Sequence, residues 1–107
     1  MSKDIVWYAT ISTPPMGKAV RKRTGYLLRL VQDGEKLSMP ESRPMPNIGK
    51  GCHELRVRDK DEYWRTVYLI AKAEIVVLEV FKKKTHKTPQ PIVASCKERI
   101  KTYRAIK

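Results

Sequence analysis

Three apolar runs decide the fold of this chain: CHELRVR (residues 52–58), YWRTVYLIA (63–71) and EIVVLEVFK (74–82). The second and third runs are rich in β-branched and aromatic residues, which are typical of β-strands, and in the first run apolar and charged side chains alternate. The segments between them, 59–62 and 72–73, are short, so each run is expected to turn back along the one before it. The sequence therefore predicts consecutive antiparallel hairpins.

The middle run predicts an interior strand, because alternation places apolar side chains on both of its faces. Arg65 lies within it, between large apolar and aromatic neighbours. Arginine is seldom placed there for solubility, and its planar guanidinium makes two charge-assisted hydrogen bonds to phosphate. We therefore interpret Arg65 as a phosphate ligand. The alternative is a structural ion pair with Glu54 or Glu79.

The first run separates its arginines from its apolar side chains. Arg56 and Arg58 share one face, whereas His53 falls on the apolar face and is interpreted as a core histidine. If helices cover only one face of the sheet, the two arginines project from the open face together with Arg65. This face leads to the turn that follows the third run.

That turn, FKKKTHKTP (residues 81–89), carries no acidic residue. The apolar run ends at Phe81, and Thr88 can cap a helix that begins near Pro89, so the turn is held at both ends. Cations that need not be ordered on binding suit a polyanion. The alternative is a solvated turn that protects the sheet edge. The basic residues of the turn are Lys82, Lys83, Lys84, His86 and Lys87.

Helical periodicity flanks the three runs on both sides. Thr13 and Pro14 are a candidate N-cap and first helical residue, and Asp33-Gly34 is a stop signal. Gly25 within this helix costs about 1 kcal/mol relative to alanine, which predicts close packing against the sheet. The apolar stripe of the first helix is Val20, Thr24, Leu27, Leu28 and Val31, and that of the C-terminal helix is Val93, Cys96, Ile100 and Tyr103.

The order of elements predicts an α+β fold. A short strand at 4–10 precedes the first helix, and the Pro- and Gly-rich stretch 37–51 predicts a loop without regular structure. We expect one domain, residues 1–107, with an antiparallel sheet and the N-terminal and C-terminal helices packed on one face.

The charge of the chain points to an anionic partner. Lys and Arg number 23 against 11 Asp and Glu, a net charge of +12. Such a field attracts nucleic acid or the ribosome. No apolar run approaches a membrane span or a secretory signal, and Cys52 and Cys96 have no metal spacing, so we expect buried free thiols and a cytoplasmic protein.

RNA can be cleaved without a metal when its 2′-hydroxyl attacks the adjacent phosphate. The protein must then assist proton transfer and neutralise charge on the phosphorane. Lysines and arginines supply the second need, and a tyrosine, a crowded lysine of lowered pKa, or His86 can move protons. We expect neither a metal nor another cofactor.

Four motifs occur in order: GYLLRLVQDGE (25–35), NIGKGCHELRV (47–57), WRTVY (64–68) and FKKKTHKTP (81–89). Together they resemble the phage-derived branch of the RelE/HigB-like toxins of bacterial type II toxin–antitoxin systems. The resemblance implies a RelE-like α+β domain that cleaves mRNA on the ribosome through basic and aromatic residues. It also implies a cognate antitoxin with a helix-turn-helix domain.

Residue by residue, the resemblance covers Arg56, Arg65, Lys83, Lys84 and Tyr68, to which we assign catalytic roles, and Lys87, to which we assign RNA binding. We also expect Arg58, Lys82 and His86 to bind RNA because of their charge and place, although the family varies at the positions of Lys82 and His86. Tyr68 falls on the opposite face of its strand from Arg65, so core packing is its alternative role. Two other functions remain open: a toxin-fold inhibitor of another target such as gyrase, and a nucleic-acid-binding protein without catalysis.

Overall fold

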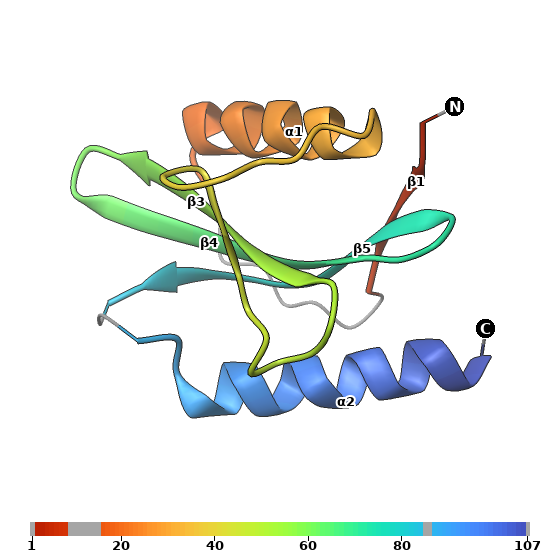
Figure 1. Ribbon diagram of the computed structural model, residues 1–107. Helices are drawn as coiled ribbons and strands as arrows, with labels where there is room; N and C mark the ends of the chain where they lie inside the picture. Colours follow the sequence, from red (N-terminus) through yellow and green to blue (C-terminus); the bar gives the residue numbers. More distant parts are fainter. Residues whose placement is uncertain (1, 9–15, 85–86, 107) are drawn as a thin grey trace.

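Five strands form one sheet in the order β1-β5-β4-β3-β2, with a helix on each side (Figure 1). The computed structural model describes residues 2–8, 16–84 and 87–106. The elements are β1 (Asp4–Trp7), α1 (Lys18–Gln32), β2 (Ser42–Pro44), β3 (Cys52–Asp59), β4 (Glu62–Ile70), β5 (Glu74–Lys83) and α2 (Gln90–Ile106).

The three apolar runs form the antiparallel strands β3, β4 and β5, as predicted. The two edges of the sheet differ from the prediction. β1 pairs with β5 in parallel, and the stretch predicted as a loop contributes β2, three residues that pair antiparallel with β3. β2 contains Pro44, and a proline is tolerated there because β2 is an edge strand.

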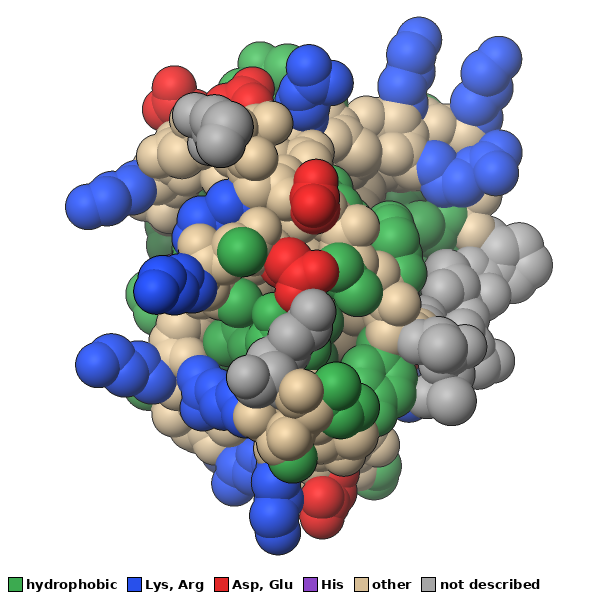
Figure 2. Space-filling model, turned by 90° about the vertical axis from the view of Figure 1, so that its right-hand side faces the viewer, with side chains coloured by type: hydrophobic (Ala, Val, Ile, Leu, Met, Phe, Trp, Pro, Cys, Tyr) green, Lys and Arg blue, Asp and Glu red, His purple; other side chains and the backbone are tan. Residues whose placement is uncertain are grey.

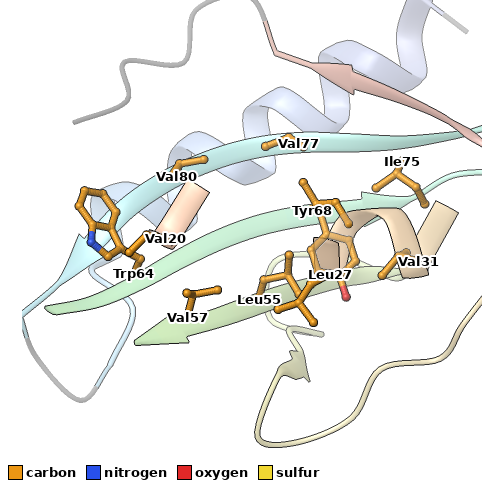
Figure 3. Packing of buried hydrophobic residues seen from close by; sticks show 11 residues of the cluster. Val20, Leu27, Val31, Leu55, Val57, Trp64, Tyr68, Ile75, Val77 and Val80 are labelled. Carbon is orange, nitrogen blue, oxygen red and sulfur yellow. The ribbon is translucent and has the colours of Figure 1, made fainter. Parts of the chain in front are cut away.

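The two helices pack on opposite faces of the sheet, so the prediction of both helices on one face is wrong. α1 buries Leu27 and Val31 against one face, where Tyr68 lies among them (Figure 3). α2 buries Val93 and Ile100 against the other. The physical reason lies in β4, whose two faces are both apolar and each need a covering layer. The α+β class itself is confirmed.

The ends of α1 are set by backbone signals. Gly34 has a φ of 92°, and the hydrogen bonds from its N–H to the carbonyl of Val31 and from the N–H of Glu35 to that of Leu30 form a Schellman motif. The stop at Asp33-Gly34 is thus confirmed. The helix begins at Lys18, after Gly17, and the predicted cap at Thr13-Pro14 lies outside the described residues.

Two further expectations concern buried or tightly packed residues. Cys52 and Cys96 are buried free thiols, as predicted. Gly25 is exposed, and a Cβ added to it meets no atom of the described residues within 4 Å. The prediction that Gly25 packs closely against the sheet is therefore wrong.

No helix in the described part of the chain is long and apolar enough to cross a membrane.

Candidate nucleic-acid interface

The predicted arginines lie at one end of the sheet face on which α2 packs, where Arg56 and Lys83 are half-buried. Arg56 of β3 pairs directly with Arg65 of β4, and Tyr63 of β4 pairs with Lys83 of β5. Residues paired across strands share a face, and so do residues two apart on one strand. Three neighbouring strands therefore bring Arg56, Arg65 and Lys83 to the same end of one face.

Arg65 is buried, with 5% of its surface exposed. Its Nη1 donates to the carbonyl of Trp64, at 3.1 Å, and its Nε lies 3.5 Å from Oε1 of Glu54. Burial, and then the charge of Arg56, lower the pKa of Arg65. The alternative role predicted for Arg65, an ion pair with Glu54, is therefore present in the structure.

Glu54 is fully buried and organises the basic residues around it. Its Oε2 accepts a hydrogen bond from Oγ1 of Thr88, at 2.7 Å. Its Oε1 lies between the guanidinium groups of Arg65 and Arg43, at 3.5 and 3.9 Å. A buried carboxylate needs such partners, because an unpaired buried charge is strongly unfavourable. Thr88 thus anchors the segment before α2 to β3.

Arg43 is a member of this cluster that sequence reasoning missed. It lies on β2, at the edge of the sheet, opposite Glu54 in the register. The surrounding prolines predicted a loop, so the sequence assigned it no face. It also lines a hollow of about 180 Å³ together with Lys87 and Thr88. We use the name cationic cluster for Arg43, Arg56, Arg65 and Lys83.

Lys83 is the member of the cationic cluster suited to proton transfer. Burial lowers its pKa, and the charges of Arg65, Arg43 and Arg56 lower it further, whereas Glu54 raises it. A lysine with a lowered pKa is neutral in a larger fraction of molecules near neutral pH, so it can accept as well as donate a proton.

A second hollow connects the cationic cluster to helix α1. It has a volume of about 400 Å³, and Pro40 and Glu41 line it together with residues of β3 and β4. Arg23 of α1 lines it opposite Arg56 and Arg65. Arg58, predicted to bind RNA, also lines this hollow, and its guanidinium lies 5.2 Å from the ring centre of Tyr63.

The family model described as phage-derived protein Gp49-like matches residues 15–101, most of the chain. The chain belongs to this Gp49-like family. Its fold is similar to that of the E. coli toxin RelE in the free state, in a variant with two arginines replaced by alanine, with a TM-score of 0.66 and 18% identity over 94% of this chain and 99% of that one. No curated protein sequence matches the chain. The predicted resemblance to a phage-derived, RelE-like family and the predicted RelE-like fold are confirmed.

Two residues predicted for the site lie on the other face of the Gp49-like sheet. Tyr68 is 1% exposed within the core under α1. Its hydroxyl lies 2.7 Å from Oγ of Ser42, its ring stacks on His53, and burial raises its pKa. Lys82 pairs in register with Trp64, on the side of α1, and its Nζ lies 3.2 Å from Oε2 of Glu62. The geometry therefore brings neither residue to the cationic cluster.

The remaining predicted residues flank the cluster along the chain. Lys84 is exposed just after β5, and Lys87 is exposed beside Arg43. His86 lies outside the described residues. The Gp49-like chain thus places Arg56, Arg65 and Lys83 together and adds Arg43, with Arg58, Lys84 and Lys87 around them.

The opposite end of the molecule has a different character. It contains a hollow of about 680 Å³ that Asp4 and Glu74 line together with Lys72 and Arg104. Figure 2 views this end and shows acidic side chains at the centre of the face, among hydrophobic and basic ones. Carboxylates repel phosphate, so the cationic cluster is the better candidate for a polyanion.

Proposed function

We propose that this Gp49-like protein is the toxin of a type II toxin–antitoxin system and that it cleaves mRNA on the ribosome without a metal. The observation that carries the proposal is the convergence of Arg43, Arg56, Arg65 and Lys83 at one end of the α2 face of the sheet. The similarity to the fold of the E. coli toxin RelE supports it.

In this proposal the arginines neutralise the phosphate. Arg56 and Arg65 are paired across two strands, so they meet one phosphate from a fixed framework. Glu54 holds the Nε side of Arg65 at 3.5 Å and thereby orients the guanidinium before RNA binds. Donors that need no reorganisation stabilise the charge that develops on a phosphorane most effectively.

Lys83 moves the proton in the proposed reaction. The neutral amine accepts the proton of the 2′-hydroxyl as its oxygen attacks phosphorus. The bond to the 5′-oxygen then breaks, and this oxygen takes a proton from the ammonium group formed on Lys83 or from water. The products are a 2′,3′-cyclic phosphate and a free 5′-hydroxyl. The lowered pKa of Lys83 supports this role.

The partners that we propose are mRNA, the ribosome and an antitoxin with a helix-turn-helix domain, in the cytoplasm.

A cluster of fixed cations also suits a second function, nucleic-acid binding without cleavage. The burial of Tyr68 under α1 favours that second function, because it removes one candidate proton carrier from the RNA-binding face. Inhibition of another target such as gyrase is a third possibility for a toxin fold.

Controlled expression followed by mapping of mRNA 5′ ends separates these functions. We expect growth arrest with new 5′ ends inside translated reading frames, and co-expression of the antitoxin should abolish both. Growth arrest with intact mRNA would exclude the cleavage mechanism and favour inhibition of another target. Protein that binds RNA but causes neither arrest nor cleavage would favour the second function.

A further inference from the structure

Helix α1 presents a strongly basic outer face that the cleavage site does not use. The helix contains five cations and no acidic residue, and all five side chains are exposed. They are Lys18, Arg21, Lys22, Arg23 and Arg29. In Figure 2 basic side chains project at the top of the molecule, where α1 lies in Figure 1.

Local helix rules are broken at several positions of this face. The first turn has no acidic residue, and Gly17 supplies no side-chain cap among the described residues. Lys18 and Arg21 instead place positive charge at the positive end of the helix dipole, which is unfavourable. Gly25 lowers helix propensity in the middle of α1, although no atom in the described part of the chain would lie within 4 Å of an added Cβ.

Two of these departures, Lys18 and Gly25, fall on one line along the helix together with two further cations. Lys18, Lys22, Gly25 and Arg29 are separated by four, three and four residues, the spacing that aligns side chains on one side of a helix. Gly25 therefore leaves a flat gap in a row of cations. Packing within the chain does not explain this gap, so it indicates close approach by a partner.

We propose that this row binds the phosphate backbone of double-helical RNA, with Gly25 at the point of closest approach. A straight row of cations matches a rigid, regularly charged backbone, whereas single strands are held mainly by stacking on aromatic rings. Arg23 connects the row to the cleavage site, because it lines the same hollow as Arg56 and Arg65. The inference rests on the proposed function only in taking RNA as the partner.

The first test adds a side chain to the row. Binding of the full chain to a labelled RNA duplex of about 16 base pairs is measured by fluorescence anisotropy, together with urea unfolding. Gly25→Gln should raise the urea midpoint, since glutamine favours the helix, and should weaken duplex binding by about tenfold, since the flanking cations lose phosphate contacts. Ala19→Gln adds the same side chain on an exposed part of α1 outside the row and should leave binding unchanged.

The second test removes charge. Lys22→Gln combined with Arg29→Gln should weaken duplex binding by about tenfold or more and flatten its salt dependence. Lys97→Gln combined with Lys101→Gln removes the same charge from the exposed side of α2 and should have a much smaller effect.

Several results would overturn the inference. Gly25→Gln could leave duplex binding unchanged. Ala19→Gln could weaken duplex binding as much as Gly25→Gln does, or the α2 pair could weaken it as much as the α1 pair does. The α1 variants could also lose binding to poly-glutamate by the same factor as they lose binding to the RNA duplex. This result would identify the row as a surface for acidic protein segments instead. Cleavage does not enter these measurements, so a chain that cleaves no mRNA but shows the expected pattern supports the row and excludes only the cleavage mechanism.

Discussion

Glu54 is the residue on which the cationic cluster depends most. Its carboxylate is fully buried and has basic groups from β2 and β4 at one oxygen and Thr88 at the other. The sequence indicated this carboxylate, together with Glu79, as an alternative partner of Arg65, and the structure shows the contact with Glu54. The sequence did not predict Arg43 or Thr88, whose contacts arise from the approach of an edge strand and a turn that are distant in sequence.

Glu54→Gln should lower the free energy of unfolding by about 3 kcal/mol, because it leaves the buried guanidinium of Arg65 without its countercharge. Glutamine keeps the shape of the side chain and an acceptor for Thr88, so the loss reports mainly the charge. Urea unfolding measures it, and Glu98→Gln on the exposed side of α2 is the control, with an expected change within about 0.5 kcal/mol. Equal stabilities of the two variants would contradict the role given to Glu54.

Lys83 should reduce the stability of the fold at neutral pH. Its pKa in the folded protein lies below the ordinary value of 10.5, so the folded state disfavours its charge. Lys83→Gln should therefore be more stable than the parent protein near neutral pH. As pH rises through the lowered pKa toward 10.5, Lys83 loses its proton in the folded parent before it does so in the unfolded chain. The difference in free energy of unfolding between Lys83→Gln and the parent therefore becomes smaller.

Urea unfolding at several values between roughly pH 7 and pH 10 tests this expectation. Lys97→Gln controls for the general loss of one positive charge. A stability difference that stays constant with pH would show that the charge of Lys83 is not disfavoured in the folded state.

At the scale of elements, α2 is attached to an irregular part of β5. The register of β4 and β5 shifts between Val67 and Tyr68, so that Leu78 is the extra residue of a bulge. Nη1 of Arg99 donates to the carbonyl of Leu78 and also lies 3.1 Å from Oε2 of Glu79. Apolar alternation predicted the three strands, but it carries no signal for a bulge or for the arginine that binds it.

Arg99→Ala should lower the free energy of unfolding by about 2 kcal/mol, since it removes charge-assisted hydrogen bonds in a partly buried position. Lys97→Ala, two residues earlier on an exposed position of α2, should change it by less than about 0.5 kcal/mol. Chemical denaturation of both variants measures the difference. An Arg99→Ala protein as stable as the parent would mean that α2 is held by its apolar stripe alone.

At the scale of the whole molecule, the two-sided covering of the sheet positions the cationic cluster. α1 and α2 lie on opposite faces (Figure 1). The end of the α2 face at Phe81, which pairs with Arg65, carries Arg56 and Arg65. The sequence predicted an open basic face and identified these arginines correctly as neighbours. It misplaced the helices, because an apolar stripe shows that a helix packs on a sheet but not which face it covers.

The neighbouring lysines Lys82 and Lys83 provide the most direct test of the central claim, that the cationic cluster cleaves mRNA. They lie on opposite faces of β5, and Lys82 forms an exposed ion pair with Glu62, which contributes little to stability. The measurement is the rate of mRNA cleavage on purified translating ribosomes, with circular dichroism as the check on folding. Lys83→Gln should lower the rate by about 100-fold or more, and Lys82→Gln by less than about twofold. Equal rates for two folded variants would contradict the claim.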